Sequence, residues 1–261
     1  MLEVKNVEYV IGGKKLLKNV SLDFLKNEFV VVMGQNGAGK TTLLNILAGS
    51  LKPTGGEVSV FKKKIESFDK TDLAKKRAVL SQHYDIAFPI SVEEIVMMGR
   101  YPHFLNVPSK DDIEIVSNAI DMMGMSEFKL RDYNTLSGGE AQKVQMARVI
   151  SQIWQEDHSE PKILFLDEPV SSLDMHYQHL ILKLIREYSL KNILVIGVIH
   201  DINLAFEYAD RVIFMKNGSV VKSYNSKEAI DTAVLKEIFE IEIGLIKNPY
   251  SDKPMFAVKN N

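Results

Sequence analysis

The order of apolar and polar residues along the chain predicts buried strands that alternate with helices. Three short runs are almost wholly apolar, at residues 29–33, 163–166 and 192–199. Continuous apolar runs of this length are typical of parallel strands buried on both faces. Residues 2–24 differ, because polar residues and Gly12-Gly13 interrupt the apolar positions there, which predicts short strands joined by turns. The chain is therefore expected to adopt an α/β fold.

In the middle of the chain, the apolar residues recur at helical spacing instead. A capping box opens a helix over residues 91–99, since a serine is followed three positions later by a glutamate. Ser109 caps a second helix, which Gly124 ends and whose apolar positions are Ile113, Val116, Ile120 and Met123. The segment between them, residues 101–108, contains two prolines and predicts a loop. We expect residues 85–155 to form an all-helical region within the α/β chain.

Strand and helix patterns return in the second half of the chain. Asp174 caps a helix whose apolar side chains recur at helical spacing, at Tyr177, Leu180, Ile181, Leu184, Ile185 and Tyr188. Residues 212–224 predict a hairpin with its turn at Asn217-Gly218, a dipeptide favoured in two-residue turns. Residues 226–239 have a helical pattern, and the tail from residue 240 to 261 has only weak strand character.

Composition and charge exclude several classes of protein. The chain has 261 residues, of which 46% are hydrophobic and 25% charged, which excludes collagen, a coiled coil and a disordered chain. Its 32 basic and 34 acidic residues leave a formal charge of −2, whereas a nucleic-acid-binding protein more often has a basic surplus. The absence of cysteine excludes disulfides, thiolate metal sites and a cysteine nucleophile.

The apolar stretches are too short to cross a membrane. A spanning helix needs about 20 mostly apolar residues, and the longest uninterrupted apolar run covers only residues 193–199. Charged residues at Glu3 and Lys5 also exclude the apolar core of a signal peptide. We therefore expect a soluble protein that is made and kept inside the cell.

A glycine-rich motif follows the first buried run. Residues 34–41 match the pattern G-x-x-x-x-G-K-[ST] and lie between that run and a helical segment at residues 41–48. Glycines allow backbone N–H groups to approach a phosphate, and the start of a helix presents further free N–H groups. The lysine reaches the outer phosphates, and the threonine hydroxyl is a ligand for Mg²⁺. Because a chance match would not need this placement, the motif predicts a nucleotide site at Gly34, Gln35, Asn36, Gly37, Ala38, Gly39, Lys40, Thr41 and Thr42.

Two acidic residues follow the second buried run, residues 163–166. Asp167 is placed to hold Mg²⁺, and Glu168 is placed to orient and activate a water that attacks a phosphate. The alternative is that these two residues are charged side chains at the end of a strand and have no catalytic function. The glycine-rich motif argues against that alternative, because it supplies the phosphate on which the two carboxylates would act.

A third motif, Leu136-Ser137-Gly138-Gly139-Glu140, gives the chain a family resemblance. Over essentially its whole length, the chain resembles the nucleotide-binding subunits of ABC transporters. The departures from common family usage, Ala141 and Val170, remove no chemical group that the mechanism needs. The motifs occur in the order of the family: the Walker A loop at residues 34–41, the Q-loop residue Gln82, the signature Ser137, Gly138, Gly139 and Glu140, the Walker B strand ending at Asp167, the D-loop with Asp174, and the switch histidine His200.

The resemblance implies a P-loop NTPase fold in one ABC domain over residues 1–261. It divides that domain into a mixed-sheet, RecA-like core with an N-terminal antiparallel β subdomain, at residues 1–84 and 156–240, and an α-helical signature subdomain inserted at residues 85–155. Residues 241–261 are left as a C-terminal tail to which no role is assigned.

The resemblance also implies that two copies of the chain sandwich two ATP molecules with Mg²⁺. Each ATP lies on the Walker A loop of one copy and beneath the signature of the other. The residues support this role, since Ser137 and two glycines open a helix and so form an anion site that has no lysine of its own. An ordinary capped helix is the alternative interpretation.

Individual residues receive catalytic roles from the same resemblance. Glu168, His200 and Gln82 are the implied catalytic residues, with His200 at the γ-phosphate and the attacking water. Gln82 also joins Thr41 and Asp167 at the metal and links that site to the membrane partner. For His200 the alternative is a core histidine whose ring is hydrogen-bonded within the protein. The order of the motifs along the chain argues against that alternative.

Two further roles are implied outside the catalytic group. Asp174 contacts the second copy, although its position also suits a plain helix cap. Tyr9 lies before the Walker A loop, where the family stacks an aromatic ring on adenine. An aromatic residue in a strand can equally belong to the core.

Three segments resemble the importer branch for iron chelates, haem and cobalamin, at residues 96–103, 174–179 and 202–205. Within that branch, the polar insertion at residues 155–161 is most similar to the ATPases of haemin importers. Haem is therefore the expected cargo, and a ferric siderophore or cobalamin is the alternative. The resemblance places the cargo in membrane subunits, so we do not expect haem to bind the histidines of this chain, such as His83, His103, His158, His176 and His179.

The implied partners are a second copy of this chain, two membrane permease subunits and, indirectly, a periplasmic or lipoprotein substrate-binding protein, with no nucleic acid. The chain is expected at the cytoplasmic face of the inner membrane as a peripheral subunit. Residues 85–110 are the expected docking region for the permease, with residues 101–104 as the contact surface. The alternatives are the ATPase of an exporter, a soluble ABC ATPase that acts on ribosomes or DNA, and a binding module without catalysis.

Overall fold

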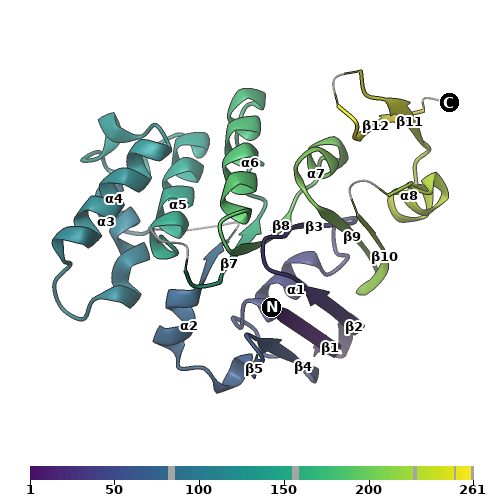
Figure 1. Cartoon of the computed structure of the whole chain (residues 1–261), viewed down its shortest axis with the longest axis horizontal. Helices are drawn as coiled ribbons and strands as arrows, with labels where there is room; N and C mark the ends of the chain where they lie inside the picture. The colour runs from purple at the N-terminus through teal and green to yellow at the C-terminus, as the bar shows by residue number, and fades with distance from the viewer. Residues whose placement is uncertain (82–85, 155–158, 226–227, 250, 260–261) are drawn as a thin grey trace.

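The computed structural model describes residues 1–81, 86–154, 159–225, 228–249 and 251–259 (Figure 1). Its centre is a six-stranded sheet with the strand order β10-β9-β3-β8-β7-β6. Neighbouring strands are parallel except β10, which pairs antiparallel with β9, so the expected mixed sheet is confirmed. The strands are β3 (Phe29–Met33), β6 (Arg77–Leu80), β7 (Lys162–Asp167), β8 (Ile193–Val198), β9 (Arg211–Lys216) and β10 (Ser219–Asn225).

The three strands predicted from continuous apolar runs form the middle of this sheet. Every residue of β3, β7 and β8 is buried. Successive residues of a strand point to opposite faces, and the two faces have separate cores. Val30 and Val32 pack with α1 (Lys40–Leu47), whereas Val31 and Met33 pack on the face that carries the other large helices. The sheet is therefore covered on both sides, as its all-apolar strands require.

An antiparallel sheet with the order β2-β1-β4-β5 lies against α1. It contains β1 (Leu2–Ile11), β2 (Lys14–Phe24), β4 (Gly55–Val60) and β5 (Lys63–Lys64). The strand-and-turn pattern of residues 2–24 is thus confirmed as the β1–β2 pair. A short η1 (Ile65–Ser67) and α2 (Lys70–Lys76) lead from β5 back to β6.

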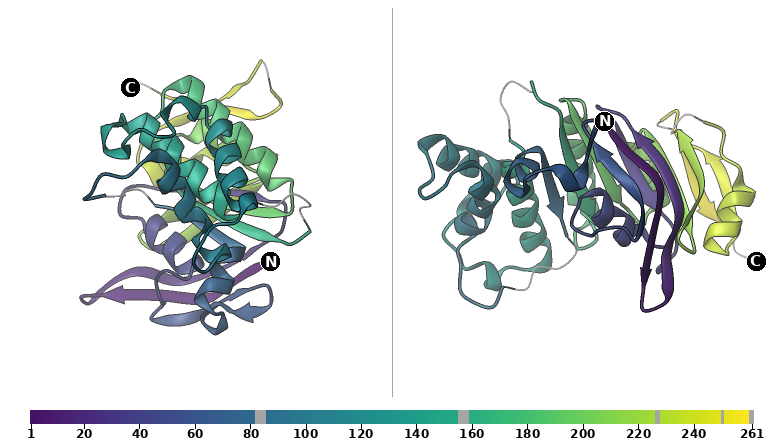
Figure 2. Two further views of the ribbon diagram at one scale, coloured as in Figure 1. Left: turned by 90° about the vertical axis from the view of Figure 1, so that its left-hand side faces the viewer. Right: turned by 90° about the horizontal axis from the view of Figure 1, so that it is seen from below.

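The inserted helical region lies at one end of the molecule (Figure 2). Its helices are α3 (Val92–Met97), η2 (Met98–His103), α4 (Lys110–Met122), η3 (Ser126–Phe128), η4 (Tyr133–Thr135) and α5 (Gly138–Gln152). The predicted capping box at Ser91 is present, and Ser109 and Ser137 open α4 and α5 in the same way. Two expectations were wrong in detail. Residues 101–103 belong to η2 rather than to a loop, and Ile113 is 46% exposed, because the buried face of α4 continues through Ala119 instead.

The helices that follow β7 and β8 lie on the same face of the central sheet as the helical region. They are α6 (Met175–Ser189) and α7 (Ile202–Tyr208). Asp174 caps α6 as predicted, but Tyr177 and Leu180 are exposed, although both belong to its expected apolar stripe. Leu182 is buried in their place, because the buried face of α6 runs through Ile181, Leu182, Ile185 and Tyr188.

The C-terminal segment lies at the end of the molecule opposite the helical region (Figures 1 and 2). The predicted helix at 226–239 is shorter than expected, since α8 spans Thr232–Phe239 and Asp231 caps it. The tail then forms a β-hairpin of β11 (Ile243–Lys247) and β12 (Pro254–Val258). One face of this hairpin is buried against the core through Ile243 and Phe256.

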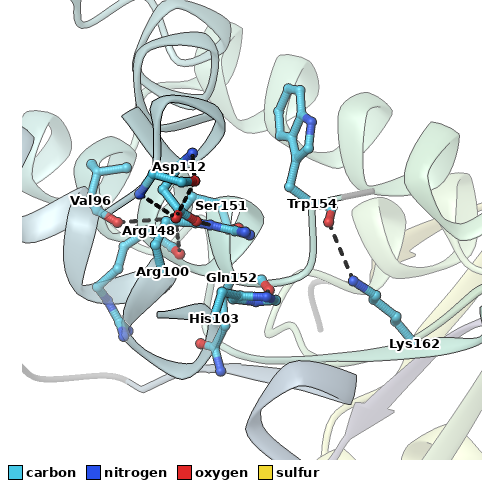
Figure 3. A network of polar contacts seen from close by, with 10 residues as sticks. Val96, Arg100, His103, Asp112, Arg148, Ser151, Gln152, Trp154 and Lys162 are labelled. Atoms are coloured by element: carbon cyan, nitrogen blue, oxygen red, sulfur yellow. Dashed lines mark hydrogen bonds and ion pairs between the residues drawn. The ribbon is translucent and has the colours of Figure 1, made fainter. Parts of the chain in front are cut away.

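A buried network of polar groups holds the end of α5 to its neighbours (Figure 3). Arg100 donates from Nε to Oδ1 of Asp112 over 2.8 Å and from Nη1 to the carbonyl oxygen of Ser151 over 2.8 Å. The Ser151 hydroxyl donates to the carbonyl oxygen of Val96 over 3.0 Å. The carbonyl oxygen of the next residue, Gln152, accepts a hydrogen bond from Nε2 of His103 over 2.8 Å. The network therefore ties α5 to η2, α3 and α4.

Breaking this network is expected to destabilise the fold. Arg100→Met leaves the buried Asp112 carboxylate without its cation, and removal of one partner of a buried pair costs about 3 kcal/mol or more. Chemical denaturation of the variant should show this loss. Lys110→Met, at an exposed lysine of the same region, is the control and should change the unfolding free energy by less than about 1 kcal/mol. Equal stability of the two variants would contradict the role given to Arg100.

Candidate functional site

The glycine-rich motif forms a tight loop between β3 and α1. Gly34 has φ 151°, and a Cβ atom there would lie 2.2 Å from the carbonyl oxygen of Met215. Gly39, the N-cap of α1, has φ 100°, and a Cβ atom there would lie 2.8 Å from the carbonyl oxygen of Leu16. Since both positions exclude a side chain, the two glycines are required for the loop to pack against its neighbours.

Lys40 opens α1 and points back into this loop. Its Nζ donates hydrogen bonds to the carbonyl oxygens of Gly34 over 2.9 Å and Gln35 over 3.0 Å. Burial lowers the pKa of Lys40, while the carboxylates of Glu168 and Asp167 act in the opposite direction. The loop therefore holds an ammonium group close to backbone N–H groups and to the start of a helix, which together favour an anion.

A cavity of about 690 Å³ opens beside the loop. Its walls combine the phosphate loop with residues from the ends of β7 and β8. They are Leu16, Asn36, Gly37, Gly39, Lys40, Thr41, Thr42, Glu168 and His200. The structure thus brings together two groups of predicted residues that are more than 120 positions apart in the sequence.

Asp167 lies at the end of β7 and is buried. Burial raises the pKa of this carboxyl, and a hydrogen bond from the Thr41 side chain opposes the shift. Its Oδ1 atom has no hydrogen-bond partner within the described ranges. A buried carboxylate oxygen without a partner, next to a threonine hydroxyl, is the hard-oxygen donor set that Mg²⁺ prefers. These two residues fit a magnesium ion.

The buried charge of Asp167 has a consequence for stability. Because folding raises its pKa above the ordinary value of 3.8, ionised Asp167 disfavours the folded state at neutral pH, and this cost disappears as the pH falls below that value. Asp167→Asn should therefore raise the melting temperature near pH 7 in metal-free buffer, by about 2–4 °C for each kcal/mol relieved. Scanning calorimetry at several pH values should show the gain shrinking toward pH ~4. A lower melting temperature near pH 7 would contradict this account, and Asp111→Asn at an exposed position is the control.

Glu168 and His200 contact each other in the wall of the cavity. Nε2 of His200 lies 2.6 Å from Oε1 of Glu168. Glu168 has φ 52°, a left-handed conformation that side-chain-bearing residues seldom adopt, and its N–H donates to the carbonyl oxygen of Val198 over 3.2 Å. Strain of this kind persists where surrounding contacts impose it and is common at functional sites. The pair therefore has a fixed geometry near the phosphate loop.

The predicted signature residues lie at the start of α5. Ser137 is the N-cap, and its hydroxyl accepts from the N–H of Glu140 over 3.4 Å. The Glu140 carboxylate in turn accepts from the Ser137 N–H over 2.7 Å, and this hydrogen bond lowers the pKa of Glu140. Gly138 and Gly139 lie against Ser172, which precedes Asp174. The four signature residues are not among the described residues that line the cavity.

Comparison with known proteins decides the family. Residues 17–171, more than half of the chain, match the family described as ABC transporter. The chain is an ABC transporter ATP-binding cassette. As a member of this family it binds and hydrolyses ATP. Its glycine-rich motif at residues 34–41 lies between β3 and α1.

Two relatives of the cassette match most or nearly all of its length. A protein of Escherichia coli O157:H7 named "Hemin import ATP-binding protein HmuV" is 39% identical over 99% of this chain and 99% of the relative. A protein of Gloeobacter violaceus with the same name is 41% identical over 85% of this chain and 80% of the relative.

Solved structures agree with the fold of the cassette. An inward-facing, putative metal-chelate type ABC transporter matches with a TM-score of 0.82 and 25% identity, over 99% of this chain and 97% of that one. The ATP-binding cassette MJ0796, solved as a post-hydrolysis dimer bound to ADP and Pi, matches with a TM-score of 0.74 and 30% identity, over 88% and 100% of the two chains.

Two of the remaining predicted residues, Tyr9 and Asp174, lie within the described ranges. Tyr9 lies on β1 opposite Leu17 and packs, half-buried, against the core beneath the antiparallel sheet; it is not among the described residues that line the cavity. Gln82 lies outside the described residues. Asp174 accepts a hydrogen bond from the N–H of Tyr177 over 3.0 Å, so its capping role is confirmed, whereas its role in contact with a second copy stays a prediction.

The histidines of the helical region and α6 have local partners. Nε2 of His103 lies 2.8 Å from the carbonyl oxygen of Gln152, and burial lowers the pKa of His103. His176 and His179 are exposed, and Nδ1 of His179 lies 2.7 Å from the hydroxyl of Tyr208. No three histidine or acidic side chains of the described ranges gather as a metal site would need. His83 and His158 lie outside those ranges.

The sequence did not point to two residues at this site. Leu16, from β2, lines the cavity and provides its apolar wall. Gln142, from α5, donates from Nε2 to the carbonyl oxygens of Glu168 over 3.3 Å and Pro169 over 3.0 Å. Gln142 thereby links α5 to the segment that carries Glu168. Neither side chain carries chemistry of its own, so a motif could not have singled them out.

Proposed function

We propose that this cassette hydrolyses Mg–ATP to drive uptake of haem through a membrane permease. The observation that carries hydrolysis is the cavity in which Lys40, Glu168 and His200 meet. The observation that supports haem is the name of relatives that match 99% and 85% of this chain, hemin import ATP-binding proteins that are 39% and 41% identical to it. The polar insertion before β7 supports the same cargo, although residues 155–158 lie outside the described ranges.

Each side chain has a defined task in this proposal. Lys40 binds the outer phosphates, and the free N–H groups at the start of α1 bind the anion beside it. The Glu168 carboxylate accepts a proton from the attacking water, and His200 contacts the γ-phosphate and holds Glu168 in place. Adenine stacks on Tyr9, which lies one strand away from Leu16 in the wall of the cavity.

The proposal includes a magnesium ion bound by two described residues. Thr41 and Asp167 would hold the ion, because Asp167 offers a buried oxygen without a partner beside the Thr41 side chain. Gln82 would complete the site. When bound, the ion neutralises charge on the phosphates. In its presence the Asp167→Asn chain should bind ATP more weakly than the unchanged chain.

The complete ATP site is proposed to need two copies of the cassette. The signature residues do not line the cavity of their own chain within the described ranges, yet Ser137 opens a helix whose N-terminus favours an anion. The similar cassette MJ0796, which is dimeric with ADP and Pi bound, supports a dimer of cassettes. Asp174 would lie at this interface, since Ser172 packs against the signature.

Ser137→Arg tests this arrangement. The variant should bind ATP as a monomer with unchanged affinity but fail to form an ATP-dependent dimer, because a cation and a large side chain would block the covering surface. Equilibrium ATP binding and light scattering measure the two properties. Ser126→Arg, at a serine elsewhere in the helical region, is the control and should dimerise normally. A dimer that forms with Ser137→Arg would remove the signature from the partner's site.

The cassette is proposed to act at the cytoplasmic face of the inner membrane. None of the helices in the described ranges has the length and apolar character of a membrane span. The proposed partners are two permease subunits and, through them, a periplasmic or lipoprotein binding protein. Exposed apolar side chains at Tyr101, Leu105 and Val107 support permease docking near η2, within the segment 85–110 predicted for it.

Haemin uptake tests the proposed function. The cassette is reconstituted with its permease in vesicles, and accumulation of haemin from a loaded binding protein is measured with and without ATP. ATP-dependent uptake that Lys40→Ala abolishes would support the proposal. Uptake of a ferric siderophore or of cobalamin in place of haemin would overturn the cargo and leave hydrolysis intact.

A further inference from the structure

The helix that follows His200 is too short to be stable without contacts from the rest of the protein. α7 contains seven residues, Ile202–Tyr208, and isolated helices of this length are not stable in water. Its N-cap, Asp201, is the residue next to His200 and accepts from the N–H groups of Asn203 over 2.7 Å and Leu204 over 3.1 Å. The backbone of His200 therefore moves with α7, and contacts that fix α7 also fix the switch histidine.

The C-terminal hairpin holds α7 near both ends. In its first turn, Asn203 donates from Nδ2 to the carbonyl oxygen of Phe256 over 3.1 Å and accepts at Oδ1 from the Phe256 N–H over 2.8 Å. In its last turn, the carbonyl oxygen of Glu207 accepts a hydrogen bond from Lys253. The Asn203 amide thus pairs with β12 as a neighbouring strand would, and the hairpin contacts α7 in both its first and its last turn.

Aromatic packing reinforces these polar contacts. The Phe256 ring is 5% exposed and lies 4.8 Å, between centroids, from the ring of Phe206 in α7. Phe206 in turn stacks on Phe214 of β9 at 6.3 Å. α7 is therefore held between the central sheet and the hairpin, so the hairpin completes its packing.

We propose that the C-terminal hairpin, through Asn203, is a positioning element for the switch histidine. It fixes α7 and thereby sets His200 at 2.6 Å from Glu168. This inference rests on the proposed catalytic roles of Glu168 and His200. It assigns a task to the tail at residues 241–261, which carries no motif, and to an asparagine that does not line the ATP cavity.

The chemistry of the contact explains why an amide is needed. Phe256 offers both a donor and an acceptor, and only a side chain with both functions satisfies the two groups at once. Aspartate at this position would keep the acceptor but face a carbonyl oxygen with a negative charge. Asn203→Asp thus keeps the shape of the side chain but should lose one of the two hydrogen bonds with Phe256.

The test compares Asn203→Ala and Asn203→Asp with Asn118→Ala, at an exposed asparagine of α4. Steady-state ATPase of the full chain should show kcat lower by about tenfold in Asn203→Ala, with the KM for ATP unchanged within about twofold, because the ATP-contacting residues are intact. Asn203→Asp should also lower kcat, because its carboxylate repels the Phe256 carbonyl oxygen. Asn118→Ala should match the unchanged chain in both constants.

A second measurement reports on His200 directly. Imidazole ¹⁵N spectra of the chain, with the His200 signals assigned by their loss in His200→Ala, should show shifted His200 resonances in Asn203→Ala and unshifted ones in Asn118→Ala. A merely structural role would lower the melting temperature without moving these resonances. Unshifted His200 signals with unchanged kcat in Asn203→Ala would overturn the inference.

Parallel assays of Glu168→Gln and His200→Ala separate this inference from the function beneath it. If both hydrolyse ATP at the unchanged rate, the proposed catalytic roles fail. If both are impaired while Asn203→Ala is unaffected, only the positioning role of the hairpin fails.

Discussion

Glu168→Gln is expected to keep ATP binding and to slow ATP turnover by about 10²–10⁴-fold, the range that a general base contributes. The amide preserves the shape of the side chain and can still contact His200, which lies 2.6 Å from Oε1 in the unchanged chain. It cannot take a proton from water. ATP should therefore remain bound and unhydrolysed, and a dimer locked by ATP should accumulate.

Two measurements on the same sample check this outcome. Equilibrium binding of ATP should give an affinity close to that of the unchanged chain, while phosphate release falls. Glu114→Gln, at an exposed glutamate of α4, is the matched control and should turn over normally. Normal phosphate release by Glu168→Gln would remove Glu168 from the role of base and direct attention to His200.

Lys40→Ala is expected to weaken ATP binding by about 10²–10³-fold. Loss of one partner from a buried, hydrogen-bonded charge contact costs about 3–4 kcal/mol, which corresponds to this change in affinity. The lysine is held at the loop by the carbonyl oxygens of Gly34 and Gln35, so its charge is already in position for a phosphate. Titration of ATP against the variant measures the loss.

Lys110→Ala provides the control, since this lysine is exposed at the start of α4. It should bind ATP as the unchanged chain does. An affinity for ATP in Lys40→Ala within about threefold of the unchanged chain would contradict the assignment of the phosphate loop, because a change of that size is less than 1 kcal/mol.

The buried strands could be predicted because their residues are almost all apolar. Residues 29–33 and 193–198 are wholly apolar apart from one glycine, and such runs must be covered on both faces. The region of β4 to β6 was not predicted from pattern, because its strands are short and carry charged residues. β5, for example, consists of Lys63–Lys64 and exists only through its pairing with β4.

Periodicity was less successful on the helices that lie at the edge of the core. Tyr177 has the spacing of an inward residue of α6, yet its ring is covered by Lys143, whose Nζ lies 3.0 Å from the ring centroid. The spacing of apolar residues identifies the apolar face of a helix. It does not show which part of that face is covered by the core. The tail shows the same limit, because its hairpin is stabilised by pairing of Phe256 with Asn203, 53 positions earlier.

The candidate site was largely predictable because its chemistry is concentrated in motifs. Lys40, Thr41, Glu168 and His200 line one cavity, as their types and order suggested. What could not be predicted is the support around them. Gln142 and Asn203 act through contacts with main-chain atoms of Pro169 and Phe256, and such contacts depend on the fold rather than on a local pattern.

The measurement that tests the central claim most directly is the ATPase rate of the cassette, reconstituted in lipid with its permease, with and without haemin-loaded binding protein. We expect the haemin-loaded form to stimulate hydrolysis, whereas carriers loaded with a ferric siderophore or with cobalamin do not, and Glu168→Gln should abolish the response. Stimulation by one of the other carriers and none by haemin would contradict the claim that this cassette energises haem uptake.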